Sequence, residues 1–353
     1  MPMMPPMVNP EMVRLAREAR GLTQNQLAIK LDISQGKISK LEDGLLTNMP
    51  DSFIDHLSKE LNFPPSFFKQ VGSSRAACAS FYRKKSALPM RILNQCDALM
   101  NIVRLQIEKL LQASDIEKKE LPHLDPDEFD GGPEEIAQRI RTLWKLPRGA
   151  IKDVTQVVED AGCIVVRFDF GTKKLDGLSI WTESGVPVIF LNPTFPSART
   201  RFTLAHELGH IVMHRIPTPD MEEQAMRFAG EFLMPENEIK SQFYPTTIDR
   251  LARLKLAWKV SMQALLMRAE QVGVLSERYS RYLWMQMGKF GYRTKEPHDE
   301  QIQSEYPTLF NELIQLHLNE LEYSTDELAE SLGMWPSDLA KEFLPPEAQL
   351  RVV

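Results

Sequence analysis

The chain has 353 residues, of which 43% are hydrophobic and 25% charged, so it is long enough for two or three globular domains. Its net charge of -6 at pH 7 argues against a protein that coats nucleic acid nonspecifically, although it leaves room for a small DNA-reading domain. No apolar run approaches the roughly 20 residues of a membrane span, and the three cysteines, Cys78, Cys96 and Cys163, have no paired spacing, so we expect a cytoplasmic protein with reduced thiols and no membrane partner.

Residues 10–69 have the pattern of a run of short helices. The first helix ends at Gly21, and the sequence Thr23-Gln24-Asn25-Gln26 is a capping box that begins a second helix, which extends through Leu31. After a three-residue turn, Ser34 caps a third helix that runs to Glu42. A helix, a short turn and a second helix predict a helix-turn-helix.

These residues resemble the phage-repressor-like helix-turn-helix family, also called XRE or Cro/C1-type. The residues that carry the resemblance are Leu22-Thr23-Gln24, Leu27-Ala28, Leu31, Ile33-Ser34-Gln35, Ile38-Ser39-Lys40-Leu41-Glu42 and Gly44. In that family the third helix reads base edges in the major groove, which maps onto Gln35, Lys37 and Ser39, while Gln24 and Lys40 would contact backbone phosphates. The resemblance implies a five-helix-type domain over residues 1–70 with double-stranded DNA as its partner.

The charge of this domain limits how tightly one copy can bind. Residues 1–70 contain eight Lys or Arg and eight Asp or Glu. A neutral domain gains little from counterion release, so we expect DNA binding to require a homodimer. The alternative is a packing domain that has lost DNA binding and contacts proteins instead.

Residues 71–125 are predicted to be a helical connector. It contains the sequence Phe81-Tyr82-Arg83-Lys84-Lys85, and residues 89–118 then follow a helical period. This long helix fits a spacer or dimerisation element and one more packed helix equally well. The Pro-, Asp- and Gly-rich stretch from Leu121 to Pro133 predicts a domain boundary.

The next region combines helices with a small sheet. Helices are expected over residues 134–144 and 151–161, and strands over residues 163–168, 178–181 and 187–191. The last two strands are joined by Thr182-Glu183-Ser184-Gly185, which predicts a hairpin. Its edge is a place where an extended substrate could add as a further strand.

The helix that follows, from about Ser197, contains His-Glu-x-x-His. His206 and His210 lie one turn apart, so their imidazoles can aim at a single point that suits a zinc ion. Glu207 is rotated away from the first histidine and is placed to act as general base on a zinc-bound water. The apolar flanks predict a helix buried in a domain core, where two such histidines are hard to attribute to a chance match.

A catalytic zinc site needs a third protein ligand. The acidic candidates downstream are Asp220, Glu222, Glu223 and Glu231. On a helix that begins near Met221, Glu222 shares the inward face of Ala225, whereas Glu223 lies about 100° round the helix. Glu222 is therefore the predicted ligand and Glu223 the alternative.

His214 is a further four residues along the motif helix. Three histidines at this spacing are spread over about 12 Å and cannot all reach one ion. We therefore exclude His214 as a ligand and expect a packed or surface histidine.

The region resembles the ImmA/IrrE family of zinc-dependent regulatory peptidases. The resemblance is carried by Gly177-Leu178-Ser179, Val188-Ile189-Phe190-Leu191-Asn192, Arg199 to His210, and a Glu-x-x-Ala, Phe-Ala, Leu-Met-Pro pattern over residues 222–235. It implies Zn2+ held by His206, His210 and an acidic residue, with Glu207 as base. Met226 departs from the family, which often has Asn or Asp there, and a partner of the ligands is then missing. Arg199 and Arg201 are candidates for substrate contact.

The sequence therefore predicts an α+β, mainly helical protein in four parts. These are a helix-turn-helix domain (1–70), a connector (71–125), a zincin-like peptidase domain with a small sheet (126–275) and a helical C-terminal domain (276–353). The last part includes a capping box at Ser324, in a stretch with an acidic face that favours packing or interaction over DNA contact.

Two functions from different classes fit these patterns. The family resemblance implies a DNA-associated regulatory peptidase that cleaves a transcriptional repressor, often itself a helix-turn-helix protein, and so releases stress or mobile-element genes. The alternative is an XRE-family regulator or antitoxin-like binder with a non-catalytic, sensing peptidase domain. Retention of both histidines and Glu207 favours the enzyme.

Overall fold

The computed structural model describes residues 8–46, 48–70, 88–114 and 119–343. Cys78 and the sequence from Phe81 to Lys85 lie outside these residues. The chain divides into two compact units. Unit 1 contains residues 1–117, 180–185 and 309–353, and unit 2 contains residues 118–179 and 186–308.

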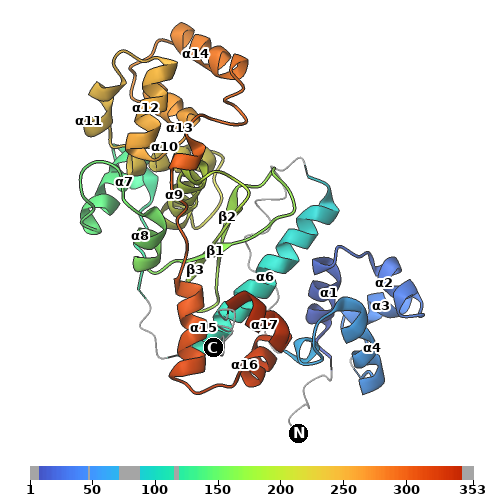
Figure 1. The fold of residues 1–353 in the computed structure, drawn as a ribbon. Helices are drawn as coiled ribbons and strands as arrows, with labels where there is room; N and C mark the ends of the chain where they lie inside the picture. The colour runs from blue at the N-terminus through green and yellow to red at the C-terminus, as the bar shows by residue number, and fades with distance from the viewer. Residues whose placement is uncertain (1–7, 47, 71–87, 115–118, 344–353) are drawn as a thin grey trace, which may run out of the picture. The chain divides into compact units, whose positions relative to one another are not determined.

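Unit 1 begins with four short helices, which Figure 1 shows in blue. They are α1 (Pro10–Ala19), α2 (Gln24–Lys30), α3 (Gln35–Glu42) and α4 (Asp51–Leu61). The capping box that begins α2 is present in both directions, because Thr23 accepts from Gln26 N and Gln26 accepts from Thr23 N. Asp32 makes the turn to α3 in the left-handed conformation, with φ 52°. The predicted helix-turn-helix is thus formed by α2 and α3.

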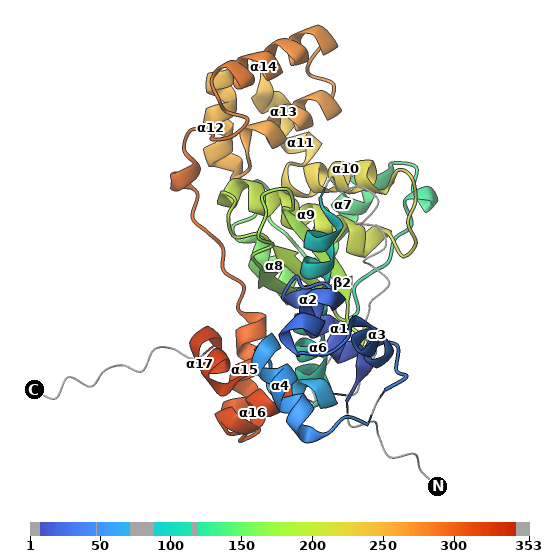
Figure 2. The ribbon, with the colours of Figure 1, turned by 90° about the vertical axis from the view of Figure 1, so that its right-hand side faces the viewer.

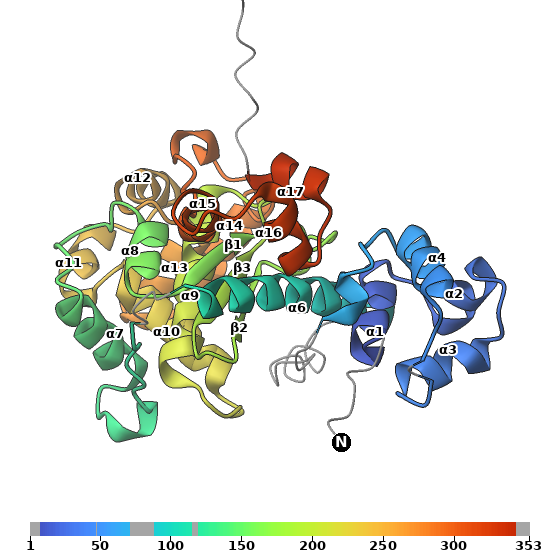
Figure 3. The same ribbon diagram turned by 90° about the horizontal axis from the view of Figure 1, so that it is seen from below.

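The long predicted helix is α6 (Met90–Gln112), which contacts α1 and helices that follow the sheet (Figure 3). Near its N-terminal end, Arg91 Nε donates to Gly21 O at 2.6 Å. Nearer its C-terminal end, Lys109 Nζ donates to Ser331 O. The elements of unit 1 that follow the sheet are α15 (Leu309–Asn319), α16 (Thr325–Leu332) and α17 (Pro336–Phe343). The contacts therefore group residues 309–343 with the first helices, while the four-part division by sequence remains a prediction.

The turn between β2 and β3 also belongs to unit 1. The backbone N–H and the hydroxyl of Ser184 each donate to Glu108 Oε2 of α6, both at 3.0 Å. The tip of the hairpin is consequently bound to α6, and only the strands remain as a possible edge for another chain.

Unit 2 contains most of a three-stranded sheet in the order β1-β3-β2, and the last two residues of β2 are grouped with unit 1. Its strands are β1 (Ile164–Arg167), β2 (Gly177–Trp181) and β3 (Pro187–Leu191), close to the predicted ranges. β1 and β3 are parallel, with Ile164 opposite Val188. All residues of β3 are buried, as expected of a central strand covered on both faces.

Helices cover this sheet and extend unit 2 beyond it (Figures 1 and 2). The helix α9 (Ser197–Met213) packs on β3 and on α10 (Met221–Leu233). The remaining helical elements of unit 2 are η2 (Pro126–Glu128), α7 (Gly132–Leu143), α8 (Val154–Asp160), α11 (Glu236–Ile239), η3 (Lys240–Phe243), α12 (Ile248–Trp258), α13 (Met262–Gln271), α14 (Glu277–Lys289) and η4 (Asp299–Gln301). The predicted fold class, α+β and mainly helical with a small sheet, is confirmed.

Two glycines allow α9 to lie close to its neighbours. A Cβ at Gly177 of β2 would lie 2.7 Å from Thr203 Cγ2, and one at Gly209 of α9 would lie 3.0 Å from Phe228 Cδ1 of α10. Larger residues would push β2 and α10 away from the motif helix. In the described part of the chain, no helix is both long and apolar enough to cross a membrane.

Candidate metal centre and DNA-reading face

Three side chains from α9 and α10 converge on one point. His206 and His210 lie one helical turn apart on α9, and their Nε2 atoms are 3.1 Å apart. Glu222, in the first turn of α10, places Oε2 at 3.5 Å from His206 Nε2 and Oε1 at 3.8 Å from His210 Nε2. Among the described residues this is the one group of three His, Cys, Asp or Glu whose ligand atoms could share a metal ion.

The other acidic candidates lie elsewhere. Glu223 and Asp220 are exposed at the start of α10. Glu231 is fully buried, forms an ion pair with Arg268 and accepts a hydrogen bond from Gln138 at 2.9 Å. The structure therefore brings together His206, His210 and Glu222, but not Glu223.

Glu207 projects from α9 toward the sheet and is 8% exposed. Its Oε2 accepts a hydrogen bond of 2.8 Å from the hydroxyl of Ser179 on β2. Burial raises the pKa of Glu207, and the nearby His206 and the Ser179 hydrogen bond only partly oppose that rise. A carboxylate held this way, next to the convergent histidines, has the position and the basicity of a general base.

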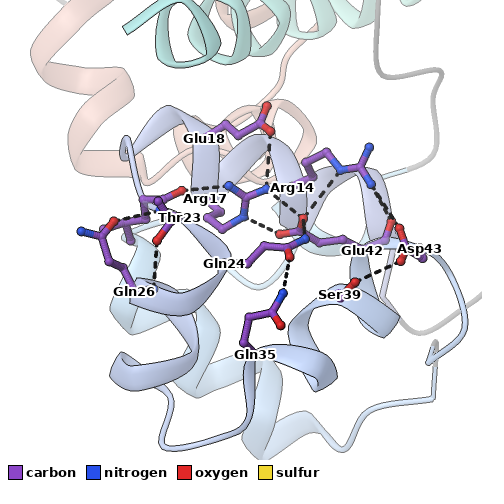
Figure 4. Close-up of polar contacts among 11 residues, drawn as sticks. Arg14, Arg17, Glu18, Thr23, Gln24, Gln26, Gln35, Ser39, Glu42 and Asp43 are labelled. Carbon is purple, nitrogen blue, oxygen red and sulfur yellow. Dashed lines mark hydrogen bonds and ion pairs between the residues drawn. The ribbon is translucent and has the colours of Figure 1, made fainter. Parts of the chain in front are cut away.

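Two of the DNA-reading candidates of unit 1, Gln24 and Gln35, belong to one chain of hydrogen bonds (Figure 4). Arg17 of α1 forms a bidentate ion pair with Glu42 of α3, at 2.6 Å and 2.8 Å. Glu42 Oε2 accepts from Gln24 Nε2 at 2.9 Å, and Gln24 Oε1 accepts from Gln35 Nε2 at 2.7 Å. The exposed Gln35 amide is thereby oriented by a buried acid at the other end of the chain.

The remaining candidates on α3 differ in availability. The Ser39 hydroxyl donates to Asp43 Oδ2 at 3.2 Å. The Lys37 ammonium lies 5.6 Å from the centre of the Phe53 ring, and Lys40 is exposed. Gln35, Lys37 and Lys40 can reach a ligand directly, whereas Ser39 would first have to leave Asp43.

Comparisons with protein families assign both regions. Residues 158–270 match the IrrE N-terminal-like domain of the M78 peptidase family, and residues 11–65 match a helix-turn-helix domain. The chain joins a helix-turn-helix domain to an IrrE N-terminal-like peptidase domain. Both predicted resemblances are thus confirmed, and this combination is that of a DNA-binding regulator with a peptidase-like domain. Searches of curated proteins and of solved structures found no match.

The three convergent side chains fit the metal that a peptidase domain of this family suggests. Ligand atoms arranged tetrahedrally at zinc-ligand lengths of about 2.0–2.1 Å lie roughly 3.3 Å from one another. The separations from His206 Nε2 to His210 Nε2 and to Glu222 Oε2, 3.1 Å and 3.5 Å, bracket that value, and 3.8 Å separates His210 from the other Glu222 oxygen. Two imidazoles and one carboxylate are also a donor set that catalytic zinc sites use.

The ring of His210 is oriented by hydrogen bonds that involve two residues for which the sequence predicted no functional role, His214 and Gln224. Its Nδ1 lies 3.0 Å from His214 Nδ1, and His214 Nε2 lies 2.9 Å from Gln224 Oε1. Because Gln224 Oε1 can only accept, His214 Nε2 carries the hydrogen, and its neutral ring presents a lone pair at Nδ1. Burial lowers the pKa of His214, which favours that neutral form. His210 Nδ1–H then donates to His214, and His210 Nε2 keeps the lone pair that faces the cluster.

His206 has no equivalent support. Its Nδ1 is buried and, among the described residues, has no hydrogen-bond partner. One histidine of the pair is thus oriented by neighbours and the other is not. That Met226 accounts for a missing partner stays a prediction.

The two arginines predicted as substrate contacts are engaged within the peptidase domain. Arg201 is 2% exposed, forms an ion pair with Glu305 and donates to Ile151 O at 2.7 Å. Arg199 forms two hydrogen bonds with Asp176, of 2.5 Å and 2.9 Å. Arg201 also lines a cavity with Asn192 and Ser304, so a role in substrate contact stays a prediction. Ser179 was missed, although the stretch Gly177-Leu178-Ser179 carried part of the resemblance.

Proposed function

We propose that the protein is a zinc-dependent metalloendopeptidase associated with DNA, which cleaves a transcriptional repressor and so releases stress or mobile-element genes. The observation that carries this proposal is the convergence of His206, His210 and Glu222, whose ligand atoms, one from each residue, lie within 4.8 Å of one another next to the buried Glu207. The match to the M78 peptidase family supports a protein substrate.

In this mechanism His206, His210 and Glu222 hold the zinc ion. When bound, zinc supplies a Lewis acid that polarises a peptide carbonyl and lowers the pKa of a water molecule. Glu207 takes the proton from the attacking water and passes it to the nitrogen of the leaving amine. Ser179 holds the Glu207 carboxylate in place through its hydroxyl, because that hydrogen bond fixes Oε2 against β2.

The substrate strand is proposed to add to β2. This strand is at the edge of the sheet, and it carries the Ser179 side chain that contacts Glu207. An extended peptide paired with β2 would therefore pass beside the general base, with backbone hydrogen bonds supplying affinity.

The helix-turn-helix domain is proposed to place the enzyme at an operator. Gln35, oriented by Gln24, has an amide that can contact adenine, and Lys37 and Lys40 are exposed beside it for bases and phosphates. Because residues 1–70 carry no net charge, specific binding would require two copies of the chain on a palindromic site. A repressor bound at the same operator would then be a nearby substrate.

The test is cleavage by zinc-loaded protein of helix-turn-helix repressors from the same genome. Wild type and Glu223→Gln are expected to cut a repressor, whereas Glu207→Gln is not. Glu223→Gln is the matched control, since it makes the same change on the exposed side of α10. Failure of zinc-loaded, folded wild type to cut any of these repressors would overturn the proposal in favour of a binder with a non-catalytic peptidase domain.

A further inference from the structure

The helix α14 presents two opposite faces in unit 2. Its inner face contains Ser280, Leu283 and Met287, which are buried. In Figures 1 and 2, α14 lies on the side of α12 and α13 that is away from α10. The opposite stripe contains Arg278, Arg281, Tyr282, Met285 and Lys289, all of them exposed, and successive members recur at helical spacing. The apolar face of α14 is thus buried in the domain, whereas its outer face is exposed.

The segment that contains this face is basic, whereas the chain as a whole is acidic. From residue 277 to residue 295 there are five basic residues and one acidic residue, a net charge of +4 in a chain whose total is -6. The acidic residue, Glu277, pairs with Arg281 at 2.6 Å, but both side chains are more than 70% exposed, so the pair contributes little. Arg293 and Lys295, in the segment after α14, are exposed as well.

Large side chains are interspersed with these charges. Tyr282, Met285 and Phe290 are 45%, 65% and 53% exposed. Proteins that bind single-stranded nucleic acid combine basic groups along the backbone with aromatic side chains on which unpaired bases stack. On a duplex the basic groups alone make the phosphate contacts. An anionic bilayer is a poorer fit, because a helix that binds at a bilayer surface inserts its apolar face, and Leu283 and Met287 of α14 are already buried in the domain.

We propose that residues 277–295 form a second nucleic-acid contact, which binds the phosphate backbone without reading sequence. Its positive charge supplies the counterion release that the neutral helix-turn-helix domain lacks. The proposal does not depend on peptidase activity, and it assigns this face a partner that neither the zinc centre nor α3 requires.

The experiment measures binding of the full chain to a DNA duplex of unrelated sequence, by fluorescence anisotropy over a salt series. The test variant combines Arg278→Gln, Arg281→Gln and Lys289→Gln on α14. The matched control combines Arg148→Gln, Lys173→Gln and Arg215→Gln, which removes the same charge from exposed positions elsewhere in unit 2. Circular dichroism checks that both variants are folded.

The two variants should separate clearly. Losing three phosphate contacts makes the slope of log K against log salt shallower by about 2.7, since each contact contributes about 0.9 on B-DNA. We expect that change in the α14 variant and a much smaller one in the control. Equal slopes for the two variants overturn the proposal. Binding of wild type to anionic vesicles or to an acidic peptide, with no binding to DNA, overturns it in favour of those partners.

Discussion

The motif helix α9 and the helix α3 of the helix-turn-helix differ in how their polar side chains are arranged. On α9 the reactive side chains converge with one residue of a packed neighbour, Glu222 of α10. On α3, Gln35 is connected to Glu42 through Gln24 of α2, and Ser39 donates to Asp43. Lys37 and Lys40 are exposed on the same helix. The side chains of the buried helix α9 thus meet one another at a single point, whereas those of the exposed helix α3 point to solvent, and only some of them are held by neighbours.

The largest effect on the α9 side is expected from the general base. Glu207→Gln removes the proton acceptor but keeps the shape of the side chain and its contact with Ser179. We expect kcat to fall by about 10²–10⁴-fold, the usual contribution of general acid–base catalysis, with zinc binding retained. Steady-state cleavage of a protein that wild type cuts measures this, and unchanged kcat in zinc-loaded Glu207→Gln would remove Glu207 from the mechanism.

The next effect separates two adjacent acids on α10. Glu222→Gln should weaken zinc binding on the order of 10²–10³-fold, since a four-ligand zinc site derives roughly 10–16 kcal/mol from its ligands together. Glu223→Gln should leave zinc affinity unchanged, because Glu223 is exposed and outside the cluster. Competition with a chelator measures both, and equal losses would show that the choice between the two acids was mistaken.

This distinction was available from the sequence because it depends on helix geometry alone. His206 and His210 are four residues apart, and Glu222 is three residues before the buried Ala225, so the period of one helix places each of them. The hydrogen-bond partners of these residues could not be predicted from the sequence. Ser179 reaches Glu207 across the fold, and the contact depends on the absence of a Cβ at Gly177, which no local pattern encodes.

A smaller effect on zinc affinity is expected when the hydrogen bonds that orient His210 are changed. Gln224→Met removes the acceptor for His214 Nε2 and leaves His210 without a fixed hydrogen position. Such partners of metal-binding histidines typically contribute 10- to 100-fold in affinity, so zinc binding should weaken by that factor. Gln224→Glu keeps an acceptor oxygen and should restore most of it.

The hydrogen bonds from Gln224 through His214 to His210 can also be tested in the protein without metal. Long-range proton–nitrogen NMR correlations report which ring nitrogen of His210 carries its hydrogen. Wild type should show it on Nδ1, and Gln224→Met should show a mixture of both forms. Full zinc affinity in Gln224→Met, together with an unchanged His210 spectrum, would reduce His214 to a packed histidine.

The smallest effect is expected for substitutions on α3, and it concerns DNA binding. Gln35→Ala should weaken operator binding by at least about fivefold, since a good side-chain contact with a base contributes about 1–3 kcal/mol. Lys37→Ala should also weaken it, whereas Lys59→Ala, an exposed basic residue on α4, is the control. Footprinting on the protein's own promoter measures these changes. A third helix that does not read DNA would give wild-type footprints for Gln35→Ala and Lys37→Ala.

In the fold, too, local features could be predicted from the sequence and long-range contacts could not. The capping box at Thr23, the hairpin and the long helix α6 follow local rules and were found where expected. The packing of residues 309–343 with α6, through contacts such as Lys109 to Ser331, joins segments more than 200 residues apart and has no local signature. The ion pair between the buried Arg201 and Glu305 is likewise a long-range contact that the sequence does not show.

The most direct measurement of the metal centre is anomalous scattering at the zinc edge from crystals of the full chain grown with one equivalent of zinc. The account predicts one strong peak within bonding distance of His206 Nε2, His210 Nε2 and a Glu222 carboxylate oxygen, and no such peak in crystals of Glu222→Gln. A peak bound by Glu223, or zinc found only at sites away from α9, would contradict it.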